Sequence, residues 1–204
     1  MSGSVAQRRS AEVRTRLMHR MLLTRHFAER GAAVPLDGCR ATFRPGEEAV
    51  AAGTWGALGP GDTVIRCLGN ADRVSAPGVL ICVGDTGAVD DLDRWLDAAR
   101  RHDRRALAAR LSTAAHGTSS PSGIVDALDA EAVLAAMRFH LDALRAGGPP
   151  RLVELRLGDA DPVAALAARM FAQHQLDENA LRAIDADTRA YVRAVLAAGP
   201  GGRP

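Results

Sequence analysis

A run of five apolar residues at 79–83, VLICV, lies between Gly78 and Gly84 and limits the fold more than any other feature of the chain. A continuous apolar run closed by glycine at both ends is typical of a strand that is buried on both faces of a parallel sheet. Further strands are expected at residues 63–66, 106–111 and 151–157.

Helical patterns alternate with these strands. Ser10 is expected to cap a first helix that begins near Ala11, and further helices are expected at 46–58, 90–105, 130–146, 162–173 and 177–197. Strands that alternate with helices predict an α/β fold, a parallel sheet with helices on both faces and with C-terminal helices at the end of the chain. We expect one domain over 10–198, a flexible N-terminus at 1–9 and a disordered tail at 199–204.

The composition is compatible with a single packed core. Hydrophobic residues make up 47 % of the 204 residues, but aromatic residues make up only 3 %, so the core must consist of Ala, Leu and Val. Trp55 and Trp95 are interpreted as core or interface anchors. No apolar run is long enough for a transmembrane helix and none follows the first arginines as a secretion signal would, so we expect a cytoplasmic protein without membrane partners.

The charges do not indicate a nucleic-acid partner. All 26 basic residues are arginine, which together with the abundance of alanine indicates a GC-rich bacterial genome. The 24 acidic residues are interleaved with them, whereas nucleic-acid surfaces gather basic residues beside stacking aromatics. The densest cluster, RRHDRR at 100–105, is interpreted as a solvated helix end.

Common metal and nucleophile patterns are missing from the sequence. Cys39, Cys67 and Cys82 are far apart and lack the spacing of metal ligands, so they are interpreted as buried thiols. The six histidines form no HxxxH or HExxH pair. His116 is interpreted as an exposed loop residue, and the segment 118–122 as a flexible turn.

Five segments together form a pattern that extends from about Arg16 to about Leu196. They are MLLTRHFAE at 21–29, PGEEAVAAG at 45–53, ALGPGDTVI at 57–65, the segment 143–157, and the helices from 161 onward with LDE at 176–178 and AID at 183–185. In this order they resemble the E1 α subunit of thiamine-diphosphate-dependent 2-oxo acid dehydrogenases of the pyruvate, branched-chain or acetoin type. The resemblance implies a shortened thiamine-diphosphate-binding fold.

The resemblance also places a vestigial cofactor site. In the family, a Gly-Asp-Gly motif after the buried strand and an Asn pair after the next strand hold Mg²⁺, which binds the diphosphate through oxygen ligands. Gly84 and Asp85 fall at the first motif, where Thr86 replaces the last glycine, and Ser112 and Thr113 fall at the Asn pair. The resemblance therefore implies that these four residues are the remnant of a cofactor site, with Asp85 the remnant of the Mg²⁺ ligand.

Other family residues are lost. Leu68 and Gly69 stand where the family has a tyrosine and an arginine that contact the cofactor, and a long family segment between Asn70 and Pro77 is absent. The catalytic histidine of the family has no counterpart in the segment 155–162. We therefore assign no catalytic residue and expect thiamine diphosphate and Mg²⁺ to bind only if the site is rebuilt or shared with a partner.

Three functions follow as hypotheses. The first is a degenerate E1 α-like subunit that is non-catalytic alone and acts by pairing with an E1 β-like partner, or with itself. The second is an active subunit of a diverged thiamine-diphosphate-dependent decarboxylase, dehydrogenase or acyl-transferring enzyme of specialised metabolism, in which Asp85, Ser112 and Thr113 form a rebuilt metal site. The third is an unrelated small α/β binding module.

Overall fold

The computed structural model describes residues 2–36, 39–66, 77–85, 89–113 and 123–198. The helices are α1 (Ser2–Ala28), α2 (Glu48–Ala57), α3 (Val89–Arg101), α4 (Ala130–Arg145), α5 (Pro162–Ala172) and α6 (Glu178–Ala197). The strands are β1 (Val34–Leu36), β2 (Cys39–Ala41), β3 (Thr63–Arg66), β4 (Leu80–Asp85), β5 (Ala106–Ser112), β6 (Ile124–Asp126) and β7 (Arg151–Arg156).

Five strands form one parallel sheet in the order β3-β4-β5-β7-β6, and β1 and β2 pair separately as an antiparallel hairpin. The buried strand β4 lies near the middle, with Ile81 level with Val64 of β3 and with Leu107 of β5. This arrangement confirms the predicted α/β fold with a parallel sheet and helices on both faces.

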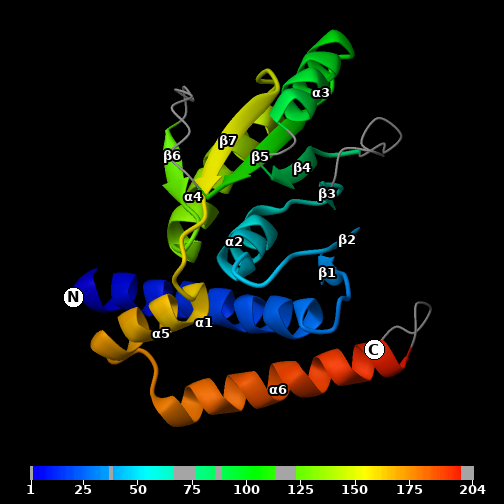
Figure 1. Cartoon of the computed structure of the whole chain (residues 1–204). Helices are drawn as coiled ribbons and strands as arrows, with labels where there is room; N and C mark the ends of the chain where they lie inside the picture. Colours follow the sequence, from blue (N-terminus) through cyan, green and yellow to red (C-terminus); the bar gives the residue numbers. More distant parts are fainter. Residues whose placement is uncertain (1, 37–38, 67–76, 86–88, 114–122, 199–204) are drawn as a thin grey trace.

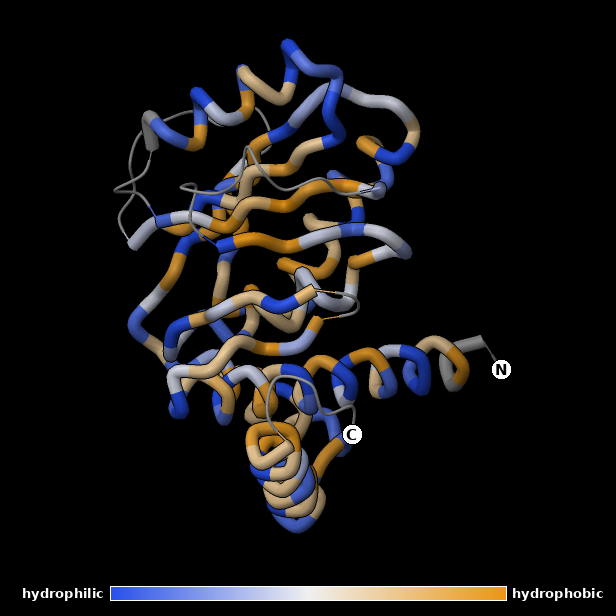
Figure 2. The backbone as a smooth tube through the Cα atoms, turned by 90° about the vertical axis from the view of Figure 1, so that its right-hand side faces the viewer, coloured by the Kyte–Doolittle hydropathy of each residue, from blue (hydrophilic) through white to orange (hydrophobic). Residues whose placement is uncertain are grey.

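The helices cover the two faces of the sheet unequally. In Figure 1, α3 lies above the sheet, whereas α2, then α1, and finally α6 follow below it. Side chains alternate between the faces along each strand: Cys82 and Ala108 face α3, and Ile81 and Leu107 join the larger core on the other side. Figure 2 shows hydrophobic residues gathered along the strands.

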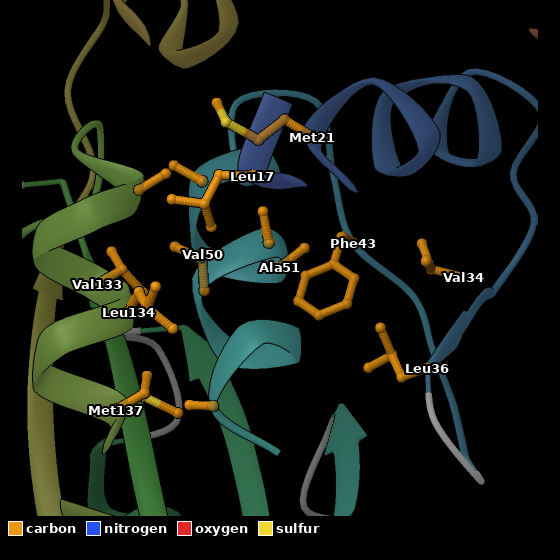
Figure 3. Close-up of a cluster of buried hydrophobic side chains, with 14 of the residues drawn as sticks. Leu17, Met21, Val34, Leu36, Phe43, Val50, Ala51, Val133, Leu134 and Met137 are labelled. Carbon is orange, nitrogen blue, oxygen red and sulfur yellow. The ribbon is translucent and has the colours of Figure 1, made fainter. Parts of the chain in front are cut away.

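The larger core is formed where α1, α2 and α4 meet. Figure 3 shows Leu17 of α1, Val50 and Ala51 of α2 and Val133 of α4 with their side chains in one cluster. Gly53 makes the approach of α2 to α4 possible, because a Cβ on Gly53 would lie 2.6 Å from Val133 Cγ1 and 2.8 Å from the backbone nitrogen of Leu134. Small residues on α2 therefore allow the two helices to pack closely.

Several predicted boundaries are wrong. Helix α1 begins at Ser2, ahead of the predicted start near Ala11, and Ser10 lies inside the helix instead of capping it. Helix α3 ends at Arg101 because the chain turns at Asp103, which has a positive φ of 49°. The hairpin β1–β2 and strand β6 were not predicted, because three-residue strands are too short for a periodic pattern.

Other expectations can be compared with the structure directly. Cys82 and Trp95 are buried, as predicted, whereas Cys39 is only half-buried and Cys67 lies outside the described residues. His116, the segment 118–122 and the tail 199–204 lie outside the described residues. None of the helices described is long and apolar enough to cross a lipid bilayer.

Candidate functional site

The carboxyl edge of the parallel sheet holds the predicted site residues. Arg66, Asp85 and Ser112 are the last residues of β3, β4 and β5, which are neighbours in the sheet. Open α/β sheets bind their ligands outside the carboxyl ends of the strands. This edge is therefore the first place to look for a ligand site.

Asp85 is held by two arginines. Its Oδ1 accepts a hydrogen bond from Arg66 Nη2 at 3.1 Å, and its Oδ2 forms an ion pair with Arg44 Nη1 at 2.8 Å. The carboxylate is 39 % exposed, whereas Arg66 is 8 % exposed, so Asp85 lies at the boundary between the interior and the solvent. Both oxygens of the carboxylate thus have cationic partners.

Arg66 also binds Glu47, which precedes α2. Arg66 Nη2 donates to Glu47 Oε1 at 2.7 Å, and Arg66 Nη1 donates to Glu47 Oε2, which completes a two-pronged pair between buried side chains. Glu47 Oε2 also accepts the backbone N–H of Arg44 at 2.9 Å. We call Arg44, Glu47, Arg66 and Asp85 the carboxyl-edge cluster; it joins β3 and β4 to the start of α2.

The structure does not bring Ser112 and Asp85 together. Asp85 is level with Leu111, which belongs to the larger core, so the next residue, Ser112, points to the α3 face of the sheet. There the Ser112 hydroxyl donates to Glu154 Oε1 at 3.2 Å, and both side chains are buried. Thr113 follows as an exposed residue.

The glycine of the predicted motif is not required by close packing. A Cβ on Gly84 would lie 3.5 Å from Leu92 Cδ1, which is ordinary van der Waals contact. Packing among the described residues would therefore tolerate a side chain at this position.

The described residues, as they are arranged, do not fit a Mg²⁺ site. A divalent cation at Asp85 would lie beside the guanidinium groups of Arg44 and Arg66, which already neutralise the carboxylate and would repel the ion. The hydroxyl of Ser112 lies on the other face, and within the described ranges no group of three His, Cys, Asp or Glu side chains is placed to hold a metal. We therefore derive no chemistry through a metal-bound diphosphate.

Charged residues of the segments 21–29 and 45–53 and of the region before α5 bind one another instead. Arg25 of α1 donates from Nε to Glu48 Oε1 of α2 at 3.1 Å and from Nη2 to Asp161 Oδ1, which precedes α5, at 2.6 Å. The pKa of Arg25 is raised: burial lowers it, but the two carboxylates outweigh this effect. One guanidinium thus joins three separate segments.

A second junction connects the turn before β3 to α4. Asp62 is buried, and its Oδ1 accepts the backbone N–H of Val79 at 2.8 Å, while its Oδ2 accepts that of Gly59 at 2.8 Å and a hydrogen bond from Arg145 Nη2. Arg145 also donates to the carbonyl of Ala57 at 3.1 Å. The Pro-Gly-Asp turn is therefore anchored to the end of α4.

A third junction connects the first helix with the last. His26 is buried, and its Nε2 lies 2.8 Å from Asp185 Oδ1 of α6, while its Nδ1 lies 3.4 Å from Glu29 Oε2. His26 and Asp185 are 159 residues apart in sequence. The pair therefore fixes the position of the C-terminal helix against α1.

Sequence reasoning found Asp85 but missed the partners that give it its role. Glu47, Glu48 and Arg25 lie in segments that were recognised, yet no periodicity indicates that their side chains meet. Arg66 is the last residue of β3, and the sequence around it does not indicate that its guanidinium binds Glu47 and Asp85. A charged residue beside an apolar run is expected to be buried, and a buried charge implies a partner of opposite charge. This was the signal in the sequence that could have indicated the ion pairs.

Comparison of this chain with protein-family models and with curated proteins finds no match in either.

Proposed function

We propose that this chain is a degenerate E1 α-like subunit of a 2-oxo acid dehydrogenase-type enzyme, non-catalytic on its own and active by pairing with an E1 β-like partner. One observation carries the proposal: the charged residues of the family-like segments form structural ion pairs with one another, and Asp85 is taken up by Arg44 and Arg66. The helices and strands of the fold are thus retained, while Asp85, the expected remnant of the Mg²⁺ ligand, is an ion-pair partner of two arginines.

The energetics support a scaffold role. The pair between Arg66 and Glu47 is buried, and removing one partner of a buried pair leaves an uncompensated charge, which is strongly unfavourable. Mg²⁺ at Asp85 would have to compete with both arginines, and release of Arg66 from Asp85 would disturb the anchored start of α2. We also propose that the protein is located in the cytoplasm; this proposal rests on the sequence alone.

The first experiment tests the partner. The full chain is co-expressed with an E1 β-like protein encoded beside it, and the mixture is analysed by size-exclusion chromatography with light scattering. We expect a complex that contains both chains. Elution of the two proteins as separate species would refute the docking proposal.

The second experiment tests the loss of the cofactor site. Isothermal titration calorimetry with thiamine diphosphate and Mg²⁺ is done on the full chain, on Asp85→Ala and on Asp91→Ala, an exposed carboxylate paired with Arg94 on α3. We expect no saturable binding to any of them. Saturable binding that Asp85→Ala abolishes and Asp91→Ala preserves would contradict the proposal and favour an active diverged subunit.

A further inference from the structure

A shallow apolar hollow lies at the opposite, amino-terminal edge of the sheet. It has a volume of about 320 Å³ and is bounded by the end of α3 and the first residues of β4 and β5. Its apolar floor consists of Leu80, Trp95, Ala99 and Ala106, and its rim carries His102 and Arg104. The volume lies at the lower end of the range found for small-molecule sites, about 300–1,000 Å³.

The hollow exists because small side chains face a large one. Ala99 and Ala106 leave space beside the indole of Trp95, which is 7 % exposed and packs in the smaller core under α3. Only α3 covers this face among the described elements, so no second helix fills the space.

A basic hollow adjoins it. This second hollow has a volume of about 580 Å³ and lies between the turn that follows α3 and the Gly-Gly-Pro-Pro segment at 147–150. Three arginines and one aspartate line the turn side: Arg100, Arg104, Arg105 and Asp103. Arg100 pairs with Asp97 at 2.6 Å, whereas Arg104 and Arg105 have no ion pair with any residue that the structure describes.

Arg104 lines both hollows, so they meet at its side chain. We propose that together they form a binding site for a small anionic amphiphile, a ligand whose apolar part lies against Trp95 and whose phosphate or carboxylate group is bound by Arg104 and Arg105. Guanidinium groups bind such headgroups through charge-assisted hydrogen bonds. The apolar floor would contribute by removing the hydrocarbon part of the ligand from water.

This site is independent of the proposed pairing function. It uses the cluster RRHDRR at 100–105, which does lie at an exposed helix end as the sequence predicts. It lies at the edge of the sheet opposite to Asp85, so loss of either function leaves the other testable.

Calorimetry with simple probes tests the proposal. Hexyl phosphate carries both parts of the ligand, inorganic phosphate carries only the headgroup, and hexanol carries only the apolar part. We expect saturable binding of hexyl phosphate, at least tenfold tighter than of either fragment and weaker at higher salt. A hexanoate titration distinguishes the headgroups: equal or tighter binding assigns a carboxylate, and weaker binding assigns a phosphate.

Fluorescence locates the bound probe. In a Trp55→Phe background Trp95 is the sole tryptophan, and its emission should change with the same affinity as the calorimetric titration. No saturable heat and no change of emission up to millimolar hexyl phosphate would overturn the proposal.

Variants separate a built site from general charge attraction. Arg104→Gln combined with Arg105→Gln, and separately Ala98→Leu, which fills the apolar hollow from the lining residue Ala98, should each weaken hexyl phosphate at least tenfold. Arg101→Gln is the matched control, because Arg101 belongs to the same charge run but lines neither hollow. The proposal would be overturned if all three variants weakened binding equally, or if none of them weakened it. Thermal melts confirm that each variant is folded.

Discussion

The two edges of the parallel sheet use arginine in opposite ways. At the carboxyl edge, Arg66 is buried against Glu47 and also binds Asp85, so carboxylates of the protein itself neutralise its charge. At the amino edge, Arg104 and Arg105 are exposed beside two hollows. The carboxyl edge, where open α/β sheets bind ligands, thus holds its charges in ion pairs, whereas the amino edge presents two arginines that have no ion pair with a described residue.

The two faces of the sheet also differ, in how closely the helices pack on them. Where α2 and α4 meet, the helices pack so closely that Gly53 has no room for a methyl group. On the α3 face, alanines leave a hollow of about 320 Å³ beside Trp95. A larger side chain should therefore destabilise the protein on the face covered by α2 and α4 and be tolerated on the α3 face.

The largest effect is expected from removing the buried arginine of the carboxyl edge, compared with an exposed arginine near the amino edge. Arg66→Met leaves Glu47 buried without its principal partner, so the free energy of unfolding should fall by about 3–5 kcal/mol. Arg100→Met removes an exposed pair with Asp97 and should change it by less than about 1 kcal/mol. Chemical denaturation of the two variants measures both values, and similar losses would show that the edges do not differ.

The next effect comes from adding a methyl group to the closely packed face. Gly53→Ala forces α2 away from α4 and should destabilise the protein by about 1–3 kcal/mol. Gly56→Ala on the same helix meets only the side-chain ends of Leu134 and Arg20, so its effect should be smaller. Ala98→Leu on the α3 face should stay within about 0.5 kcal/mol. Thermal melts rank the three, and a harmless Gly53→Ala would contradict the packing described for α2 and α4.

A smaller effect is expected at Asp129, which begins α4 at the carboxyl edge. Burial alone would raise the pKa of this carboxyl, but the hydrogen bond from Arg169 and the backbone N–H groups of Ala132 and Glu131 lower it. The folded pKa lies below the unfolded pKa, so the stabilisation is present above the unfolded pKa and is lost as the pH falls through the folded pKa.

Asp129→Asn tests this pH dependence. Asparagine still caps the helix, so the loss at pH 7 should be under about 1 kcal/mol. The free energy of unfolding of the variant should then decrease less than that of the original protein between pH 5 and pH 2.5. Asp91→Asn, at an exposed pair on α3, is the control, and an unchanged acid dependence in Asp129→Asn would contradict the assignment.

The smallest effect is expected near the amino edge, at His140 of α4. Burial, followed by the charge of Arg151, lowers its pKa, and its Nδ1 has no hydrogen-bond partner among the described residues. Protonation is therefore easier in the unfolded chain, and stability should fall slightly as the pH is lowered from 7.5 through 6.5.

His140→Gln should reduce this loss between pH 7.5 and pH 5.5, measured by urea denaturation. His19, whose pKa is lowered by burial and by Arg20, should account for part of the remainder. If His140→Gln keeps the full pH dependence of the original protein, the buried imidazole is not its source.

Local patterns were sufficient to predict most of the fold. The run at 79–83 and the periodicity of α4 and α6 are strong enough to place a buried strand and two amphipathic helices. Neither the hairpin β1–β2 nor strand β6 could be predicted, since they are three residues long and depend on their neighbours.

The candidate site could be predicted only in part. A Gly-Asp pair after a strand identifies the end of β4, but the sequence does not show that Arg44 and Arg66 occupy its carboxylate. Nor does it show that Ser112 faces away from Asp85, because that depends on the register between β4 and β5. These are contacts between distant segments, which a single sequence does not reveal.

The contact between α1 and α6 has a consequence for synthesis of the protein. Helix α1 is synthesised before α6, and the residue that binds His26 is added 159 positions after it. During that interval α1 lacks the cover that α6 provides in the folded protein, as is typical of chains with distant contacts. We expect the nascent chain to engage chaperones until α6 has emerged, and a ribosome-bound chain stopped before α6 to be digested readily by protease.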